Sequence, residues 1–349
     1  MFDFIVAELD SEIDCEYATK IGETTTEKII ALDGESATID ELASLNDATL
    51  EGVYPTVAKA KESDLPVFVY NKGVAAAPRV KVARPKVLIP VFPGTNCEYD
   101  SARVVEHAGA EADIVVIRNL TSDDVARSVE TVAKKIADSQ MIFIPGGFSG
   151  GDEPDGSAKF ITAFFRNPEI KEQVAKLLDE RDGLMLGICN GFQALIKLGL
   201  VPYGKIIDTD ASCPTLTHNI IGRHQSKLVR TRVCTNKPPW LTGTSVGEIC
   251  TVPISHGEGR FLCDEALART LAENGQIATQ YVDLDGNPSM DTAFNPNGSI
   301  FAIEGITSPD GRVLGKMGHS ERIGNVLYKN VVGKYDMKLF ESAVRYFKL

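Results

Sequence analysis

From Lys86 onward, short apolar runs alternate with amphipathic segments of helical length, and this alternation limits the possible folds more than any other feature. The sequence predicts helices at about 97–108, 122–137, 168–180 and 190–197, and strands at VLIPVF, ADIVVI, MIFIPGG and GLMLGI. Strands that alternate with helices in this way form βαβ units, in which helices cover both faces of a parallel sheet. We therefore expect an α/β fold with a mostly parallel sheet.

Beyond Gly204 the apolar runs are shorter and closer together. KLVRTRV, EICTVPI, SIFAIEGI and RVLGKM have the composition of strands, and their spacing predicts an antiparallel extension of the sheet. The last segment, 337–347, carries Phe340, Val344 and Phe347 at helical spacing. We expect it to form a helix that packs on the sheet.

The first 85 residues have a different pattern. Residues 21–45 predict a strand, a turn at Asp33 and Gly34, and a short helix capped near Thr38 or Asp40. Residues 57–85 mix one apolar run with Gly, Pro and Lys, which is typical of a linker. The predicted organisation is a small α+β segment over 1–56, a linker over 57–85 and the α/β domain over 86–349.

Charge and cysteine content exclude several classes of protein. The net charge of -12 argues against nucleic-acid binding, for which a basic patch is expected. No stretch approaches the roughly 18 apolar residues of a membrane span, and the acidic first twenty residues do not resemble a signal peptide. The seven cysteines are dispersed without metal-ligand spacing. We expect a cytoplasmic protein with free thiols and no metal or membrane partner.

The segment LMLGICNGFQ, residues 184–193, places Cys189 where an apolar strand turns into a helix. A nucleophile on such a turn needs small neighbours, which Gly187 and Gly191 provide. The helix N-terminus favours a thiolate, and the backbone N-H that follows can stabilise an oxyanion. The alternative is that Cys189 is an inert buried thiol at an ordinary strand-to-helix turn.

Two histidines could serve as the base that such a thiol requires. His319 follows an apolar strand and has Glu321 two residues later, while His256 follows EICTVPI and has Glu258 at the same spacing. Residues two apart share a face of extended chain, so either carboxylate could orient its imidazole. Proton-transfer chemistry alone fits either pair.

Six motifs in order resemble those of class I glutamine amidotransferases, and more narrowly of the glutaminase domains in phosphoribosylformylglycinamidine synthases. They are FPGTNC, IPGGFS, GICNGFQ, SHGEGR, NPNGS and ITSPDGRVLGKMGHSER, and they span the chain from about Lys86 to its end. The resemblance implies a flavodoxin-like fold in which Cys189 is the nucleophile, His319 the general acid and base, and Glu321 the residue that orients His319. It implies no cofactor in this chain.

The resemblance also assigns secondary roles. Gly146, Gly147 and Asn190 would form the oxyanion hole, while Gln193 and His256 would lie at the glutamine pocket, His256 alternatively at a partner interface. The family commonly has His-Pro-Glu where this chain has Ser320 between His319 and Glu321. Proline would stiffen this loop, so serine relaxes a constraint without removing a reacting group.

The implied partner is a synthetase domain or subunit that uses ATP and Mg²⁺ and receives the ammonia. Residues 1–56 resemble the end of such a synthetase domain, which predicts either a portion of a longer enzyme or a separate subunit. We also expect the partner to organise the loops at 146–152 and around His319. Two alternatives remain open on the sequence: another cysteine hydrolase of this scaffold, such as a DJ-1-like protein or a peptidase, and a non-catalytic glutaminase-like subunit.

Overall fold

The computed structural model describes residues 5–58, 65–73, 77–149, 157–324 and 327–348. Contacts divide the chain into two compact units, Met1–Thr56 and Val57–Leu349. In the described part of the chain, no helix has both the length and the apolar character needed to cross a membrane.

The first unit is a hairpin followed by one helix: β1 (Ile29–Leu32), β2 (Glu35–Thr38) and α1 (Ile39–Ala48). Asp33 and Gly34 have φ of 50° and 86°, as a tight hairpin turn requires. Thr38 caps α1, and its hydroxyl accepts from the Glu41 N-H while the Glu41 carboxylate accepts from the Thr38 N-H. The predicted strand, turn and capped helix are confirmed.

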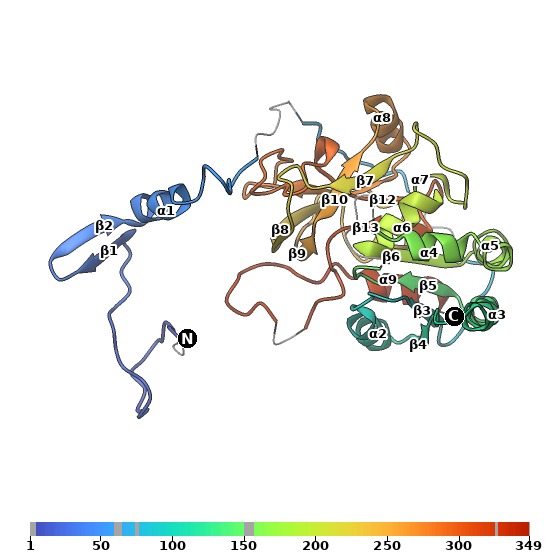
Figure 1. The fold of residues 1–349 in the computed structure, drawn as a ribbon, viewed down its shortest axis with the longest axis horizontal. Coiled ribbons are helices and arrows are strands. Elements are labelled where there is room, and N and C mark those ends of the chain that lie inside the picture. Colours follow the sequence, from blue (N-terminus) through green and yellow to red (C-terminus); the bar gives the residue numbers. More distant parts are fainter. Residues whose placement is uncertain (1–4, 59–64, 74–76, 150–156, 325–326, 349) are drawn as a thin grey trace. The chain divides into compact units, whose positions relative to one another are not determined.

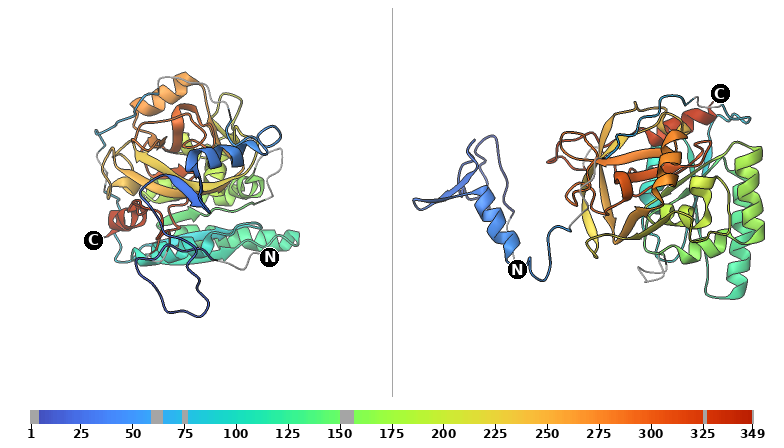
Figure 2. Two further views of the ribbon diagram at one scale, coloured as in Figure 1. Left: turned by 90° about the vertical axis from the view of Figure 1, so that its left-hand side faces the viewer. Right: turned by 90° about the horizontal axis from the view of Figure 1, so that it is seen from above.

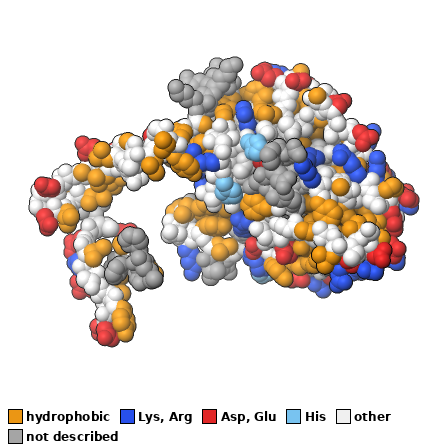
Figure 3. Space-filling model, viewed as in Figure 1, with side chains coloured by type: hydrophobic (Ala, Val, Ile, Leu, Met, Phe, Trp, Pro, Cys, Tyr) orange, Lys and Arg blue, Asp and Glu red, His pale blue; other side chains and the backbone are white. Residues whose placement is uncertain are grey.

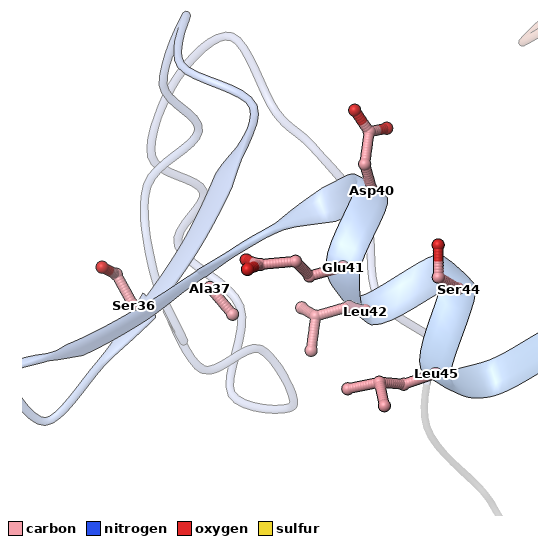
Figure 4. Close-up of a pocket in the computed structure, with 7 residues that line it drawn as sticks. All are labelled: Ser36, Ala37, Asp40, Glu41, Leu42, Ser44 and Leu45. Carbon is pink, nitrogen blue, oxygen red and sulfur yellow. The ribbon is translucent and has the colours of Figure 1, made fainter.

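This small unit leaves apolar side chains in solvent. Every residue of β1 is exposed, and no residue of α1 is buried. Hydrophobic side chains are visible on its surface in Figure 3. Figure 4 shows a shallow pocket between β2 and α1, lined by Ser36, Ala37, Asp40, Glu41, Leu42, Ser44 and Leu45. None of the predicted catalytic residues lies in this unit.

The second unit is built on a nine-stranded mixed sheet with the order β4-β3-β5-β6-β13-β12-β11-β8-β9 (Figure 1). The first five strands are parallel: β4 (Glu111–Val116), β3 (Lys86–Val91), β5 (Met141–Ile144), β6 (Leu184–Ile188) and β13 (Val313–Lys316). The other four are antiparallel: β12 (Ile303–Thr307), β11 (Ile277–Val282), β8 (Gln225–Val233) and β9 (Ile249–His256). A separate ribbon pairs β7 (Thr215–His218) with β10 (Glu258–Leu262).

Helices cover both faces of the parallel half, as expected (Figures 1 and 2). In one group, α2 (Glu98–His107) contacts α9 (Leu339–Phe347). In the other, successive contacts join α3 (Ser122–Asp138), α5 (Pro168–Ala175), α4 (Lys159–Phe165) and α6 (Asn190–Leu198). The shorter α7 (Leu200–Tyr203) follows α6, and α8 (Glu265–Glu273) precedes β11. Three further short helical segments are η1 (Lys176–Glu180), a π-helix, and η2 (Pro239–Leu241) and η3 (Ile300–Ala302), which are 3-10 helices.

The strand at RVLGKM differs from its prediction. It was expected within the antiparallel extension, yet β13 pairs in parallel with β6 and antiparallel with β12. It is therefore the junction between the two halves of the sheet. The reason is that β5 pairs with only one edge of β6. The four residues of β13, all buried, pair with the other edge. This junction places the end of β13 beside the end of β6.

Described residues of 57–85 belong to the second unit and bond the rest of it. The Phe68 N-H donates to the Gln280 side-chain oxygen at 3.0 Å, and the Tyr70 N-H donates to the Cys234 carbonyl at 2.8 Å. Tyr70 also forms a parallel bridge with Thr235. Phe68 and Tyr70 therefore lie against the antiparallel half of the sheet, whereas the Val82 N-H donates to the Phe347 carbonyl of α9 at 2.9 Å.

Candidate active site

Cys189 lies on a sharp turn between β6 and α6. Its φ of 53° and ψ of -106° are outside the regions that side-chain-bearing residues usually occupy. A Cβ on Gly187 would lie 2.6 Å from the Gly191 backbone, and a Cβ on Gly191 would lie 2.0 Å from the Ile144 carbonyl oxygen. The two glycines are therefore required by close backbone packing, as predicted. The turn leaves the Cys189 thiol near the N-terminus of α6.

The registry of β6 and β13 brings the two halves of the site together. Lys316, the last residue of β13, is opposite Ile188, the last residue of β6. The Cys189 N-H donates to the Lys316 carbonyl at 2.9 Å. The chain after β13 therefore continues at the same edge of the sheet as Cys189, and His319 lies three residues along it.

His319 and Glu321 form a buried hydrogen-bonded pair. The His319 Nδ1 is 2.6 Å from the Glu321 Oε1, and both side chains are at most 2% exposed. Burial acts to lower the pKa of His319, but the Glu321 carboxylate and the Cys189 thiol outweigh it and raise that pKa well above its ordinary value. The His319 Nε2 has no hydrogen-bond partner among the described residues. The ring nitrogen opposite Glu321 is thus free for proton transfer.

A second thiol lies beside this pair. The Cys97 sulfur is 4.0 Å from the His319 Nδ1 and accepts from the Arg322 guanidinium at 3.3 Å. The ligand atoms of Cys97, His319 and Glu321 lie within 4.8 Å of one another, a set that could hold a metal ion. The 2.6 Å separation of Nδ1 and Oε1 is that of a hydrogen bond, and the Arg322 charge opposes a cation. The donor geometry therefore fits a hydrogen-bonded cluster better than a metal centre.

The loop after β5 packs directly on the His319 ring. A Cβ on Gly146 would lie 2.7 Å from the His319 Cε1, so any side chain at this position would displace the ring. Gly147 has φ of 154° and forms a bridge with Thr95. The two predicted glycines therefore lie at the site, held against the loop that carries Cys97.

The side chains of Asn190 and Gln193 are buried and bonded within the protein. The Asn190 Oδ1 accepts from the Ser149 hydroxyl at 2.6 Å, and its amide nitrogen donates to the Gln193 Oε1 at 2.9 Å. The Gln193 amide donates to the Glu258 carbonyl at 2.6 Å. These bonds join α6 to the loop after β5 and to β10. The predicted contact of Gln193 with glutamine stays a prediction.

His256 lies close to His319, but its ring is not paired with a carboxylate. It ends β9, is 2% exposed, and neither of its ring nitrogens has a hydrogen-bond partner among the described residues. Burial, together with the nearby His319 and His224, lowers the pKa of His256 to about 3. Glu258 does not bond it; its carboxylate accepts from the Ser157 N-H at 3.2 Å instead. Of the two His-x-Glu sequences, only the one at His319 forms a pair.

Sequence reasoning missed three residues near the site. Cys97 and Arg322 were not singled out, although each lies in a quoted motif, FPGTNC and GHSER. His224 had no distinguishing context, yet its Nε2 is 3.1 Å from the Ser255 hydroxyl, and the Ser255 carbonyl is 3.9 Å from the Cys189 sulfur. Only the position of Cys97 and Arg322 inside motifs offered a signal.

Comparison with known proteins identifies the family of this chain. The family described as the CobB/CobQ-like glutamine amidotransferase domain matches residues 84–347. The phosphoribosylformylglycinamidine synthase subunit PurQ of Methanococcus maripaludis strain C7 is 36% identical over 262 residues, covering 73% of this chain and 87% of the relative. The PurQ subunit of Gloeobacter violaceus is 34% identical, covering 74% and 97%.

A solved structure gives the same result in three dimensions. One chain of the structure of PurLQS from Thermotoga maritima matches with a TM-score of 0.53 and 28% identity, covering 76% of this chain and all of that one. The matched family spans the whole sheet and every residue of the cluster around Cys189 and His319. The chain therefore belongs to the CobB/CobQ-like glutamine amidotransferase family.

Proposed function

We propose that this chain hydrolyses the side-chain amide of glutamine and supplies the ammonia for the synthesis of formylglycinamidine ribonucleotide. The relatives named above are subunits of phosphoribosylformylglycinamidine synthase, which supports this choice among amidotransferases. The observation that carries the proposal is the strained Cys189 at the sheet edge it shares with the His319 and Glu321 pair. The family match disfavours a peptidase or a DJ-1-like protein.

In the proposed reaction the Cys189 thiolate attacks the carboxamide carbon of glutamine and forms a carbon-sulfur bond. The carbon-nitrogen bond then breaks, and the His319 imidazolium gives its proton to the leaving ammonia. Water next attacks the thioester and transfers a proton to the neutral His319, the carbon-sulfur bond breaks to release the Cys189 thiolate, and the new carboxyl group of glutamate loses its proton to solvent. Glu321 stabilises the imidazolium in both steps, because its carboxylate bonds Nδ1.

Backbone N-H groups would stabilise the tetrahedral oxyanion. We assign this role to the N-H groups of Asn190, the first residue of α6, and of Gly147 in the loop after β5. His256 would contact glutamine or the partner as a neutral donor or acceptor, since its lowered pKa makes it a weak base. The buried Gln193 amide would fix α6 to β10 beneath the glutamine site, through its hydrogen bond to the Glu258 carbonyl.

The consumer of the ammonia would be a cytoplasmic synthetase partner that binds ATP and Mg²⁺. Free glutaminase activity wastes glutamine, so we expect slow turnover by the isolated chain and faster turnover with the partner. Residues 150–156, which include part of the loop predicted to respond to the partner, lie outside the described residues. Glutaminase activity with and without the nucleotide-loaded synthetase measures this coupling.

Covalent labelling tests the nucleophile. Diazo-oxonorleucine, a reactive glutamine analogue, should modify Cys189 rapidly and no other cysteine, and Cys189→Ala should abolish both labelling and glutamine hydrolysis. Cys97→Ser is the matched control, since Cys97 is also buried and also close to His319. Labelling that maps to Cys97, or activity that persists in Cys189→Ala, would contradict the proposal; a chain that never labels would be the non-catalytic subunit.

A further inference from the structure

Lys316 and Glu304 form an ion pair inside the second unit. Their Nζ and Oε1 atoms are 3.1 Å apart, and the side chains are 1% and 0% exposed. Glu304 is on β12 and Lys316 ends β13, so the pair bridges two neighbouring strands. Burying two charges costs several kcal/mol each, so such a pair rarely contributes net stability. A different benefit has to explain why the chain holds it here.

The pair makes hydrogen bonds to the segment that leads to His319. The Glu304 Oε1 accepts from the Gly318 N-H at 2.6 Å, while the Lys316 ammonium donates to the Gly318 carbonyl at 3.0 Å. The second carboxylate oxygen of Glu304 accepts from the Thr279 hydroxyl on β11. Both polar groups of Gly318 are therefore fixed by one ion pair, one residue before His319.

The same pair also reaches the nucleophile. The Lys316 carbonyl accepts from the Cys189 N-H at 2.9 Å, so Lys316 bonds the turn of Cys189 through its backbone and the His319 segment through its side chain. Space around Gly318 is tight, because a Cβ there would lie 2.8 Å from Val252 and 3.0 Å from the Glu304 Oε1. Movement of the pair would shift His319 relative to Cys189.

The loop of His319 needs such support in this chain. Ser320 stands where proline would otherwise restrict the backbone between His319 and Glu321. The Ser320 N-H instead donates to the Gly318 carbonyl at 3.0 Å, the same oxygen that Lys316 holds. Hydrogen bonds anchored on a buried ion pair thus fix a loop that lacks the proline.

We propose that the Lys316 and Glu304 ion pair is a positioning device that holds His319 in line with Cys189 for proton transfer. This inference rests on the proposed function, because it assumes that these two residues react. Neither Lys316 nor Glu304 would touch glutamine. Their effect should therefore fall on the rate of the chemical step and not on substrate affinity, since small misplacements of a reacting group slow catalysis strongly.

The test is the double variant Lys316→Met/Glu304→Leu in the full chain. Apolar residues of similar size can replace a buried pair with little loss of stability, so the variant should fold, which thermal unfolding checks. We expect kcat for glutamine hydrolysis to fall about 10- to 100-fold while KM changes less than about threefold. Labelling of Cys189 by diazo-oxonorleucine, measured as a rate per folded molecule, should slow in parallel even where part of the protein unfolds.

Arg312→Met is the matched control, because Arg312 directly precedes the other end of β13. Arg312 forms ion pairs with Asp182 at 3.2 Å and Asp310 at 2.6 Å and is 16% exposed, so its loss perturbs the same strand without touching Gly318. It should lower stability and leave kcat unchanged. A folded double variant with full kcat overturns the positioning role, and so does an equal loss of kcat in Arg312→Met. Activity that persists in Cys189→Ala overturns the proposed function itself.

Discussion

Two stretches of this chain carry the same short pattern, a histidine and a glutamate two residues apart after a strand, and they have different structures. After β13 the chain turns tightly, with the Arg322 N-H donating to the His319 carbonyl at 3.2 Å, and the Glu321 carboxylate folds back onto the His319 ring. After β9 the chain bends at Gly257 into β10, which pairs with β7, and Glu258 is the first residue of β10. Its carboxylate contacts Ser157 and His218 and makes no hydrogen bond to the His256 ring.

The difference sets opposite charge states in neighbouring rings. The pKa of His319 is raised well above its ordinary value, mainly because the Glu321 carboxylate overcomes the effect of burial. The pKa of His256 falls to about 3 because burial is not offset by a carboxylate. Of these two neighbouring buried imidazoles, His319 is thus suited to proton transfer, whereas His256 is neutral. The segment that follows each pattern decides between these outcomes.

The largest effect should separate the two histidines. His319→Ala is expected to lower kcat for glutamine hydrolysis by about 10²- to 10⁴-fold, the range for loss of a general acid and base. His256→Ala should change kcat less than about tenfold and act mainly on KM, as expected for lost binding contacts. Steady-state kinetics of both variants measures this ranking. The reverse ranking would move the catalytic assignment to His256.

Substitution of Glu321 should likewise lower kcat more than substitution of Glu258, but by a smaller factor than separates the two histidines. Glu321→Gln keeps an acceptor near Nδ1 but removes the charge, which is worth about 1.5 to 3 kcal/mol for a charge-assisted hydrogen bond and predicts a loss of about 10- to 100-fold in kcat. Glu258→Gln is the matched variant, since Glu258 is also buried but contacts Ser157 and His218, and not His319 or His256. Its kcat should stay within about threefold. Equal losses would show that the His319 pair has no special role.

Local sequence was sufficient where local bonds decide the structure. The hairpin turn at Asp33 and Gly34 and the Thr38 cap depend on atoms within a few residues, and both were predicted. The strand β11 was not predicted, because IATQYV reads as polar at Thr279 and Gln280. Those side chains are buried with distant partners, as in the Gln280 amide that donates to the Phe301 carbonyl at 2.8 Å. Their burial depends on the tertiary fold.

The site shows the same limit. The turn at Cys189 was predictable because its glycine neighbours are adjacent in sequence, whereas Cys97 lies 222 positions from His319 and reaches it only through two loops. No periodicity or spacing links residues so far apart. The ion pair of Lys316 and Glu304 was also missed, since a buried lysine on a strand looks like an exposed one until its partner is known.

Acid should destabilise the protein through His256 more than through an exposed histidine. In the unfolded chain His256 binds a proton as pH falls below about 6.5, whereas in the folded chain it stays neutral until pH is about 3. The contribution of neutral His256 to the free energy of unfolding is therefore fully present above about pH 6.5 and is lost progressively as pH falls. Between pH 7 and pH 5 this amounts to about 2 kcal/mol. Denaturant unfolding at both pH values should show this loss reduced in His256→Gln.

The control for this measurement is His107→Gln on the exposed end of α2. It should retain the full dependence of stability on pH, because the His107 ring is exposed to solvent in the folded chain and the substitution leaves the buried His256 unchanged. An unchanged pH dependence in His256→Gln would show that the buried ring is not neutral at pH 5. It would also weaken the contrast between the two histidines.

The smallest effect is expected where the loop of His319 departs from the common His-Pro-Glu pattern. Ser320→Pro would remove the N-H that bonds the Gly318 carbonyl, at a cost of about 0.5 to 1.5 kcal/mol, and would restrict the unfolded chain, which offsets about 0.4 to 1 kcal/mol. The free energy of unfolding should therefore change by less than about 1 kcal/mol. Because Lys316 still holds the Gly318 carbonyl, kcat should stay within about fivefold. In the Lys316→Met/Glu304→Leu background the proline should instead raise kcat, since it would supply part of the lost constraint. A proline that leaves that background unimproved would indicate that rigidity between His319 and Glu321 is not what the ion pair provides.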